Sequence, residues 1–432
     1  MKKSLAILVL IFAINLWSTI GFVVNSGSET LSRIDFETGE IDNAFSVLGS
    51  MPNRVALTQE FAYVVNSGDN NIQKINLQTG NTETVIFIGL STNPYDIFLN
   101  EDFAYVSGGL SNKVYKIDLS LDEVIDEVEV GGNPAGMAIF GGKLYVGNTD
   151  YSNYYTNCTL SIIDLQTFSV TNTIPTEINP QFLEVINDQI HISCGGDWGN
   201  IGGKICILDP ILEEISEVIE IGGVTYNLAQ TPNEIVYVSD GFGYNLFAYD
   251  ADDFSVIYNN ANPFTPGGTM VAADDENLFV LGGEWGQNFT VKKFDFNENL
   301  IDEYEVALYA TDIKLMPDET GITNYQLPVT YYQLSNYPNP FNPSTEITFN
   351  LITKDAKNVN IEVYNLKGQK VNELVPSLYH PEPVEGRGTI NKYTVVWEGI
   401  DQTSKPVSSG VYLYRLKVDG VVTASSKMIL IK

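Results

Sequence analysis

The sequence has few of the residues on which enzymes and metal sites most often rely. It contains two histidines, His191 and His380, and three cysteines with no Cys-x-x-Cys pair. Two histidines offer no convincing Ser-His-Asp set, and a zinc or redox motif lacks its cysteine pairs. No D-x-[DN]-x-[DN]-G calcium loop is present. From these motifs we predict no catalytic residue, no metal site and no cofactor.

Basic residues are also scarce. The chain has 23 Lys and Arg against 54 Asp and Glu, a formal net charge of −31. Residues 333–432 carry 11 basic and 9 acidic side chains, so nearly all of the negative charge precedes residue 333. Such a field repels nucleic acid and anionic membrane surfaces, and we expect no nucleic-acid partner.

Long apolar runs are missing except at the N-terminus. Lys2 and Lys3 precede the apolar run from Leu5 to Trp17, and the small residues Thr19 and Gly21 follow it. This order of a basic, an apolar and a small-residue region is typical of a secretory signal peptide, which we place at residues 1–21. No other segment approaches the ~18 apolar residues of a membrane helix, so we expect no transmembrane segment.

Helical periodicity is absent from the middle of the chain, and a repeat takes its place. F-V-V-N-S-G-S-E-T-L-S-R-I-D-F-E-T-G from Phe22 and Y-V-V-N-S-G-D-N-N-I-Q-K-I-N-L-Q-T-G from Tyr63 are identical at 8 of 18 positions. Seven units have this pattern of residues, and each is expected to contain four short strands. Four strands per unit and a period near 40 residues predict a β-propeller.

The fold class predicted is therefore all-β, with a seven-bladed propeller over residues 22–319. The first unit begins at its first strand and the last, A-T-D-I-K-L from Ala310, ends with a fourth strand. The last strand should thus complete the sheet begun by Phe22 and close the ring. The second strand of each unit ends in an Asp or Asn, which we interpret as a turn-forming residue rather than a catalytic series. These residues are Asp35, Asn76, Asp118, Asp164, Asp209, Asp250 and Asp295.

The repeat resembles the YVTN and YncE-like seven-bladed propellers of bacterial surface proteins. The resemblance rests on Y-V-V-N-S-G at Tyr63, K-I-D-L at Lys116, G-G-N-P at Gly131 and T-G at Thr79. It covers Phe22 to about Glu319 and implies the fold rather than an activity, because propellers serve both enzymes and binding proteins.

Candidate ligand-binding residues lie in the loops between the first and second strands of the later units. These loops pair aromatic rings with carboxylates in G-D-W-G-N, D-G-F-G-Y-N and G-E-W-G-Q-N, and glycines surround them. Such loops suit stacking on a sugar ring or an apolar ligand, and loop packing is the alternative. The candidates are Tyr154, Asp197, Trp198, Phe242, Glu284 and Trp285.

We therefore expect a binding module for a glycan or a surface protein rather than an enzyme. The streptogramin lyases share the propeller fold and, as a family, depend on a histidine and acidic residues. Here only His191 is available, and its place in the repeat is equivalent to Tyr63 and Tyr105, which favours a structural role. A lyase, or a hydrolase that uses two carboxylates such as Asp197 and Glu284, stays open as the alternative.

The last hundred residues have a different pattern. Residues 320–333 are expected to form a linker, and alternating strands then predict a small β-sandwich over residues 334–432. Three segments of this part resemble the type A C-terminal sorting domain of the type IX (Por) secretion system: Y-P-N-P-F-N-P from Tyr337, G-V-Y-L-Y-R-L from Gly410 and K-M-I-L-I-K from Lys427.

This resemblance implies that the signal peptide serves the first membrane and the sorting domain the second, so that the type IX machinery is a partner. The protein should then be secreted or displayed on the outer-membrane surface. The residues that carry the motif are Tyr337, Pro338, Asn339, Pro340, Gly410, Tyr412, Arg415, Lys427 and Lys432.

The three cysteines leave one further question open. An odd count in an exported protein means at least one unpaired thiol or an intermolecular bond. Cys194 and Cys206 flank a loop and are candidates for cross-strand neighbours, whereas Cys158 lies in the preceding unit. The sequence does not decide between a disulfide and free thiols.

Overall fold

The computed structural model describes residues 19–100, 102–316, 334–351, 359–365, 367, 369–379, 391–403, 405–418 and 421–431. Most of the predicted signal peptide, all of the predicted linker and Lys432 lie outside these residues. Within them every element of regular secondary structure is a β-strand except one short 3₁₀-helix, η1 (Tyr151–Asn153). The all-β prediction is confirmed.

The first part of the chain forms seven four-stranded antiparallel sheets, which we call blades 1 to 7, each named with its innermost strand first. Blades 1 to 3 are β4 (Pro52–Leu57), β5 (Phe61–Asn66), β6 (Asn71–Asn76) and β7 (Thr82–Phe87); β8 (Pro94–Asn100), β9 (Phe103–Gly108), β10 (Lys113–Asp118) and β11 (Glu123–Glu129); and β12 (Pro134–Phe140), β13 (Lys143–Asn148), β14 (Thr159–Asp164) and β15 (Ser169–Pro175). Blades 4 to 6 are β16 (Pro180–Ile186), β17 (Gln189–Cys194), β18 (Lys204–Asp209) and β19 (Glu214–Glu220); β20 (Thr225–Gln230), β21 (Ile235–Asp240), β22 (Leu246–Asp250) and β23 (Val256–Tyr258); and β24 (Met270–Ala273), β25 (Asn277–Gly282), β26 (Asn288–Asp295) and β27 (Leu300–Leu308).

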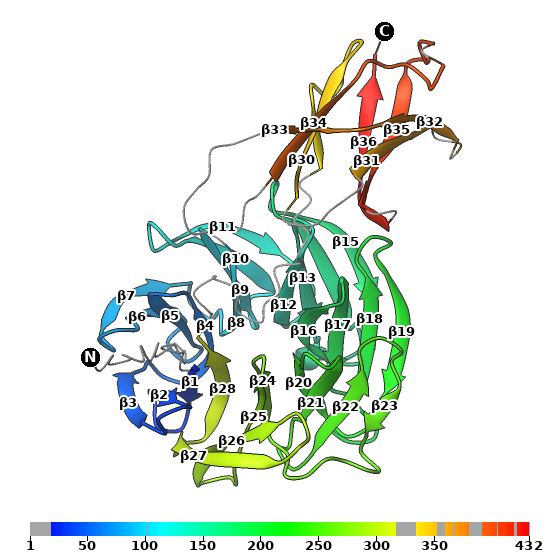
Figure 1. Ribbon diagram of the computed structural model, residues 1–432. Coiled ribbons are helices and arrows are strands. Elements are labelled where there is room, and N and C mark those ends of the chain that lie inside the picture. The colour runs from blue at the N-terminus through cyan, green and yellow to red at the C-terminus, as the bar shows by residue number, and fades with distance from the viewer. Residues whose placement is uncertain are drawn as a thin grey trace, which may run out of the picture.

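Blade 7 joins the two ends of the ring. Its innermost strand is β28 (Ala310–Leu315), which pairs with β1 (Ile20–Asn25), followed by β2 (Thr30–Asp35) and β3 (Ile41–Val47). The innermost strands of neighbouring blades contact one another around the whole ring, β28 against β4 included. Figure 1 shows this closure, with β28 beside β1. The prediction that the last strand completes the first sheet is confirmed.

The hydrophobic core lies between the blades. Seven clusters of buried apolar side chains each combine residues of two neighbouring blades, and together they fill all seven interfaces. In the interface of blades 6 and 7, for example, Phe36 packs on Phe279 at 4.4 Å and edge-to-face on Tyr304 at 5.0 Å between ring centroids. Each blade is a sheet with two apolar faces, and both faces are buried only when a blade packs on each side.

Turns follow the third strand of each blade, which is the second strand of each repeat unit. These turns explain the repeated Asp and Asn. In all seven units the side-chain Oδ1 accepts a hydrogen bond from the backbone N–H two residues ahead, and a second from the N–H three or four residues ahead. The interpretation of these residues as turn formers is confirmed.

A second set of polar contacts, hydrogen bonds from backbone N–H groups to side chains, links neighbouring innermost strands. Asp312 of β28 accepts the Val55 N–H of β4 at 2.9 Å, and Asp96 of β8 accepts the Met137 N–H of β12 at 3.2 Å. Asn227 of β20 does the same for Val271 of β24 at 2.5 Å. These side chains satisfy backbone donors that sit between sheets, where no ladder partner is present.

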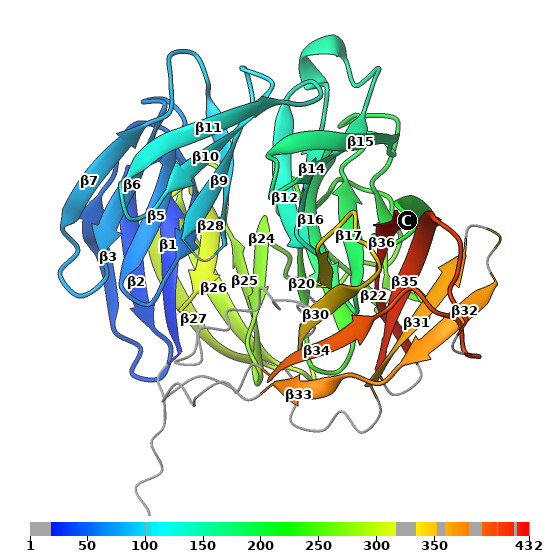
Figure 2. The ribbon, with the colours of Figure 1, turned by 90° about the horizontal axis from the view of Figure 1, so that it is seen from above.

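The last part of the chain is a sandwich of two four-stranded antiparallel sheets (Figure 2). One sheet has the order β29 (Ser335–Tyr337), β30 (Thr345–Leu351), β34 (Asn391–Trp397) and β33 (Ser377–Tyr379), and the other β32 (Lys370–Leu374), β31 (Val359–Asn365), β35 (Gly410–Val418) and β36 (Val421–Leu430). Their shared core contains Trp397, Tyr414 and Phe349, all essentially buried.

The closure of the ring gives a first prediction. Replacing Asp312 with alanine removes the acceptor of the buried Val55 N–H at the junction of blades 7 and 1. We expect the free energy of unfolding to fall by about 1–3 kcal/mol, the usual cost of leaving such a group unsatisfied. Urea denaturation measures it. The control is Glu83→Ala on the exposed strand β7, and equal losses in both variants would contradict the assigned role.

Candidate functional site

Four of the predicted ligand-binding rings are exposed on one face of the propeller. We call it the loop face, formed by the loops that join the second and third strands of each blade. Tyr154, Trp198, Phe242 and Trp285 belong to the β13–β14, β17–β18, β21–β22 and β25–β26 loops of four successive blades. Their exposed fractions are 89%, 39%, 54% and 80%. Large apolar side chains at this exposure mark a surface that water solvates poorly.

Trp198 and Phe242 form one pair across two blades. Their ring centroids are 5.6 Å apart at an interplanar angle of 88°, an edge-to-face contact. The Trp198 ring lies over Gly241, where an added Cβ would come within 3.2 Å of it. Trp198 itself has a φ of 59°, so the tight turn of its loop holds the ring in this place.

Trp285 belongs to a separate pair. Its ring packs edge-to-face on Tyr309 at 4.4 Å, in the connection that leads into β28. The structure thus brings Trp198 and Phe242 together and places Trp285 against a residue that the sequence patterns had not indicated. Tyr309, like Trp198, is held by a positive φ, here 54°.

The two predicted carboxylates differ in their surroundings. Asp197 Oδ1 accepts the backbone N–H groups of Ile201 at 2.8 Å and Gly199 at 3.0 Å, and these bonds lower the pKa of Asp197. Asp197 is therefore an ionised former of the Trp198 loop. Glu284 is exposed on blade 6, and blade 5 stands between it and Asp197. A general acid needs a raised pKa and a partner about 5–9.5 Å away, and Asp197 lacks the first.

His191 is placed far from solvent. It is fully buried in β17, and its Nδ1 lies 2.6 Å from the Tyr249 hydroxyl of the neighbouring blade. Burial lowers the pKa of His191 to about 3, so the ring is neutral at physiological pH. These surroundings indicate that His191 has a structural role in the core.

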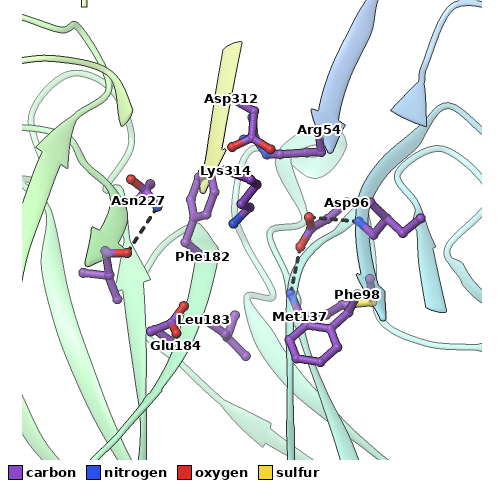
Figure 3. Close-up of a pocket in the computed structure, with 12 residues that line it drawn as sticks. Arg54, Asp96, Phe98, Met137, Phe182, Leu183, Glu184, Asn227, Asp312 and Lys314 are labelled. Carbon is purple, nitrogen blue, oxygen red and sulfur yellow. Dashed lines mark hydrogen bonds between the residues drawn. The ribbon is translucent and has the colours of Figure 1, made fainter. Parts of the chain in front are cut away.

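A group of charged side chains that the sequence patterns had not indicated lies on the propeller axis (Figure 3). The innermost strands contribute Arg54, Asp96, Glu184, Asp312 and Lys314 to a narrow channel. The free space is about 30 Å³, enough for one or two water molecules and far below the ~300 Å³ of a typical ligand pocket. The channel therefore has room for water rather than for an organic ligand.

Arg54 lines this channel and contacts residues of several blades. Its guanidinium lies 4.7 Å from the Phe182 ring, 5.3 Å from Tyr95 and 5.7 Å from Tyr226, which surround it as a cage. It donates to the Thr311 carbonyl at 2.8 Å and to the Tyr226 hydroxyl at 3.1 Å. These contacts join blades 1, 2, 4, 5 and 7 at one cation, and the side chain is only 3% exposed.

The carboxyls beside Arg54 are hard to ionise. Burial raises the pKa of Asp96 to about 6 and that of Glu184 to about 7, although Arg54 and Lys314 oppose the first shift and Lys314 the second. Asp96 also accepts the N–H groups of Ile97 and Met137, which fixes its position. A signal for this site existed in the sequence, because charged residues interrupt apolar innermost strands at Arg54, Asp96 and Asp312.

The segment with three prolines is joined to the final strand of the sandwich. Asn339 donates through Nδ2 to the Lys427 carbonyl at 3.2 Å and accepts the Ile429 N–H on Oδ1 at 2.9 Å. Phe341 continues this pairing, with its N–H bonded to the Ile429 carbonyl and its carbonyl to the Ile431 N–H. Pro338 and Pro340 are exposed, and Tyr337 is 84% exposed.

The other motif residues lie on β35. Gly410 begins the strand, Tyr412 packs edge-to-face on Trp397 at 5.0 Å, and Arg415 lies 5.1 Å from the Tyr364 ring. The Tyr412 hydroxyl donates to the Ser408 carbonyl at 2.7 Å. Two of the three motif segments, from Tyr337 and from Lys427, thus meet in space, and the third supplies core and sheet contacts.

Residues 335–378 match the family described as the secretion system C-terminal sorting domain. The sorting domain indicates export through the type IX secretion system, with the protein secreted or displayed on the cell surface. The partner implied is the type IX machinery. No helix in the described part of the chain is long and apolar enough to cross a membrane.

The propeller is similar in fold to several solved structures. One is a functionally unknown protein from Desulfotomaculum acetoxidans (13% identity, TM-score 0.53, covering 69% of this chain and 99% of that one). Another is Kuenenia stuttgartiensis hydrazine synthase (15% identity, TM-score 0.51, covering 67% and 93%). At these identities the likeness shows the fold alone. No curated protein is significantly similar to the chain in sequence.

The axial carboxyls give a pH prediction. The pKa of Glu184 is raised on folding, so its stabilising contribution is present below about pH 4.3 and is lost as pH rises through about 7. Glu184→Gln cannot ionise. We therefore expect the difference in free energy of unfolding, Glu184→Gln minus wild type, to be about 1–2 kcal/mol larger at pH 8 than at pH 5. The value is set below the full pKa shift because the carboxyl is only half-buried.

Denaturant unfolding at the two pH values measures this difference. Glu303→Gln on the exposed strand β27 is the control, because it removes one negative charge without touching the channel. If the two variants change with pH in the same way, the effect comes from the overall charge and not from the channel.

The sorting domain gives a third prediction. Asn339→Ala removes both bonds to β36, so we expect the Ile429 amide to exchange its hydrogen at least tenfold faster, as a loss of about 1.4 kcal/mol of local stability implies. Asn339→Asp keeps the acceptor and should lie between. Tyr337→Ala is the control, because that ring is exposed. Unchanged exchange in Asn339→Ala would show that the pairing does not hold β36.

Proposed function

We propose that the exported propeller is a binding module and that its ligand contacts the loop face. The observation that carries the proposal is the exposure of Tyr154, Trp198, Phe242 and Trp285 on four successive blades of one face. Exposed aromatic rings cost solvation free energy and are enriched where proteins bind partners. Loops on a rigid propeller are also the usual place for binding residues.

The ligand class we favour is a glycan, with a surface protein as the second candidate. The edge-to-face pair of Trp198 and Phe242 leaves part of both rings open to solvent, which suits the C–H face of a sugar. Asp197, next to Trp198 in the chain, and Glu284, next to Trp285, supply exposed carboxylate acceptors for sugar hydroxyls. The axial channel is too small for an organic group, which favours a ligand that contacts the exposed rings of the loops.

A lyase or glycan-active hydrolase is the weaker candidate. The hydrogen bonds that stabilise ionised Asp197 disfavour it as a general acid, and Glu284 lies two blades away. The buried His191 is out of reach of a ligand on the loop face. Enzyme action therefore has less physical support than binding.

The remaining parts of the chain are assigned by the same proposal. We infer that residues 1–21 are a signal peptide, residues 22–319 the propeller, residues 320–333 a linker and residues 334–432 the sorting domain. The YVTN and YncE-like character of the repeat also belongs to this proposal. Its support is the repeated Y-V-V-N-S-G motif, which forms the second strand and following loop of its blade.

A glycan array on the full exported protein tests the proposed function. We expect binding to a limited set of glycans, and about tenfold weaker binding for both Trp198→Ala and Trp285→Ala, a loss of about 1.4 kcal/mol each. Leu212→Ala is the matched control: it removes a side chain 67% exposed in the β18–β19 turn on the opposite face.

Three results would change the proposal. Binding that is unaffected in both tryptophan variants would remove the loop face as the site. The absence of any glycan binding, together with capture of a surface protein that needs Trp198, would favour the second ligand class. Turnover of a bound glycan that Asp197→Asn abolishes would move the protein to the enzymes.

A further inference from the structure

Two cysteine thiols lie at the base of the loop that carries Trp198. Cys194 is the last residue of β17, and Cys206 is the third residue of β18. Their Sγ atoms are 3.7 Å apart, and both residues are 1% exposed. The three cysteines of the chain are free thiols in this structure. Two thiols in van der Waals contact at a loop base call for a chemical explanation.

The strand register places both side chains on one face of blade 4. Cys194 pairs with Lys204 and Ile192 with Cys206, so the two cysteines are diagonal neighbours. A disulfide needs an Sγ–Sγ distance of about 2.05 Å, and the two sulfurs must therefore approach by about 1.7 Å. Rotation about the two Cα–Cβ bonds and a small shift of β18, whose pairing with β19 is irregular between Ile207 and Leu208, next to Cys206, would provide that movement.

We propose that Cys194 and Cys206 are oxidised to a disulfide in the exported protein and that this bond fastens the base of the Trp198 loop. Export is what makes the reaction available. The sorting domain marks the protein for export, and export takes it from the cytoplasm, where thiols are kept reduced, into compartments that sustain disulfides.

The chemistry requires an oxidant, and we assign this role to the disulfide of an extracytoplasmic thiol–disulfide oxidoreductase. The thiolate of one cysteine attacks one sulfur of the oxidant's disulfide, which forms a mixed disulfide and releases the oxidant's other sulfur as a thiolate. The second cysteine then loses its proton and attacks the sulfur of the first, which breaks the mixed disulfide and releases the oxidant's remaining sulfur as a thiolate. The two cysteines lose two protons and two electrons, and the oxidant leaves as a dithiol.

The timing follows from burial. Both sulfurs are covered by the core between blades 3 and 4 in the folded protein. The exchange therefore occurs while blade 4 is still open to the oxidant, and packing of the blades then protects the product.

The third cysteine accounts for the odd count. Cys158 donates to the Thr149 carbonyl at 3.2 Å and accepts the Asn179 N–H at 3.3 Å. These bonds hold its sulfur in the β13–β14 loop region, and the close sulfur pair is Cys194 with Cys206. Cys158 thus stays a thiol in this assignment.

The bond would close a ring of residues 194–206, which contains Asp197 and Trp198. Closing a loop of this size removes conformational freedom from the unfolded chain. It also limits the opening of the loop base in the folded protein, so that the Trp198 ring keeps its place against Phe242.

Thiol counting on the full exported protein tests this assignment. The chain is recovered from the medium or surface of the producing cells, denatured without reductant and treated with an alkylating reagent. We expect one labelled cysteine, Cys158, before reduction and three after it, and a Cys194–Cys206 cross-link in the peptide map. Three labels before reduction, or a cross-link through Cys158, would overturn the proposal.

A second measurement connects the bond to the loop. Reductant should lower the midpoint of thermal unfolding and speed hydrogen exchange in residues 195–203 of wild type and of Cys158→Ser. The double variant Cys194→Ser, Cys206→Ser should not respond to reductant. An equal response in the double variant would exclude a role for this pair. Neither measurement needs a ligand, so the result is independent of the glycan-binding test.

Discussion

Every blade of this propeller is a sheet with two apolar faces, and neither face is buried until a neighbouring blade covers it. The seven clusters of the core lie between blades rather than inside them. Hydrophobic burial in this molecule is therefore a property of pairs of blades, and all seven pairs form only if the ring closes through β28 and β1. The contacts of the axial charges and the placement of the loop face depend on that closure.

The axis shows how polar groups are used under the same constraint. Asp312, Asp96 and Asn227 accept backbone N–H groups from the adjacent innermost strands, and Arg54 contacts residues of several blades at once. These side chains find partners only when the blades surround the axis. They consequently favour the closed ring over open arrangements of the same sheets.

Much of the fold was predictable because its signals are local. The repeat, the Asx turns such as Asp118 and the ring closure follow from periodicity and short-range hydrogen bonds, and the sorting domain from contiguous motifs. The Arg54 cage was missed because Tyr95, Phe182 and Tyr226 come from three other blades, and no local pattern shows that they converge. The repeat pattern put the candidate rings on one face, where the structure also has them. It did not indicate that Trp285 packs on Tyr309, because Tyr309 lies outside the glycine-rich loops from which the candidates were chosen.

The pairing of β1 with β28 also affects the order in which the propeller can fold. β1 precedes the other strands of the ring, yet its partner β28 lies almost 300 residues later in the chain. Until β28 arrives, one edge of β1 presents unpaired backbone groups that invite pairing with other chains. Non-local contacts slow folding, so we expect the pairing of β28 with β1 to be a late step in the folding of the propeller.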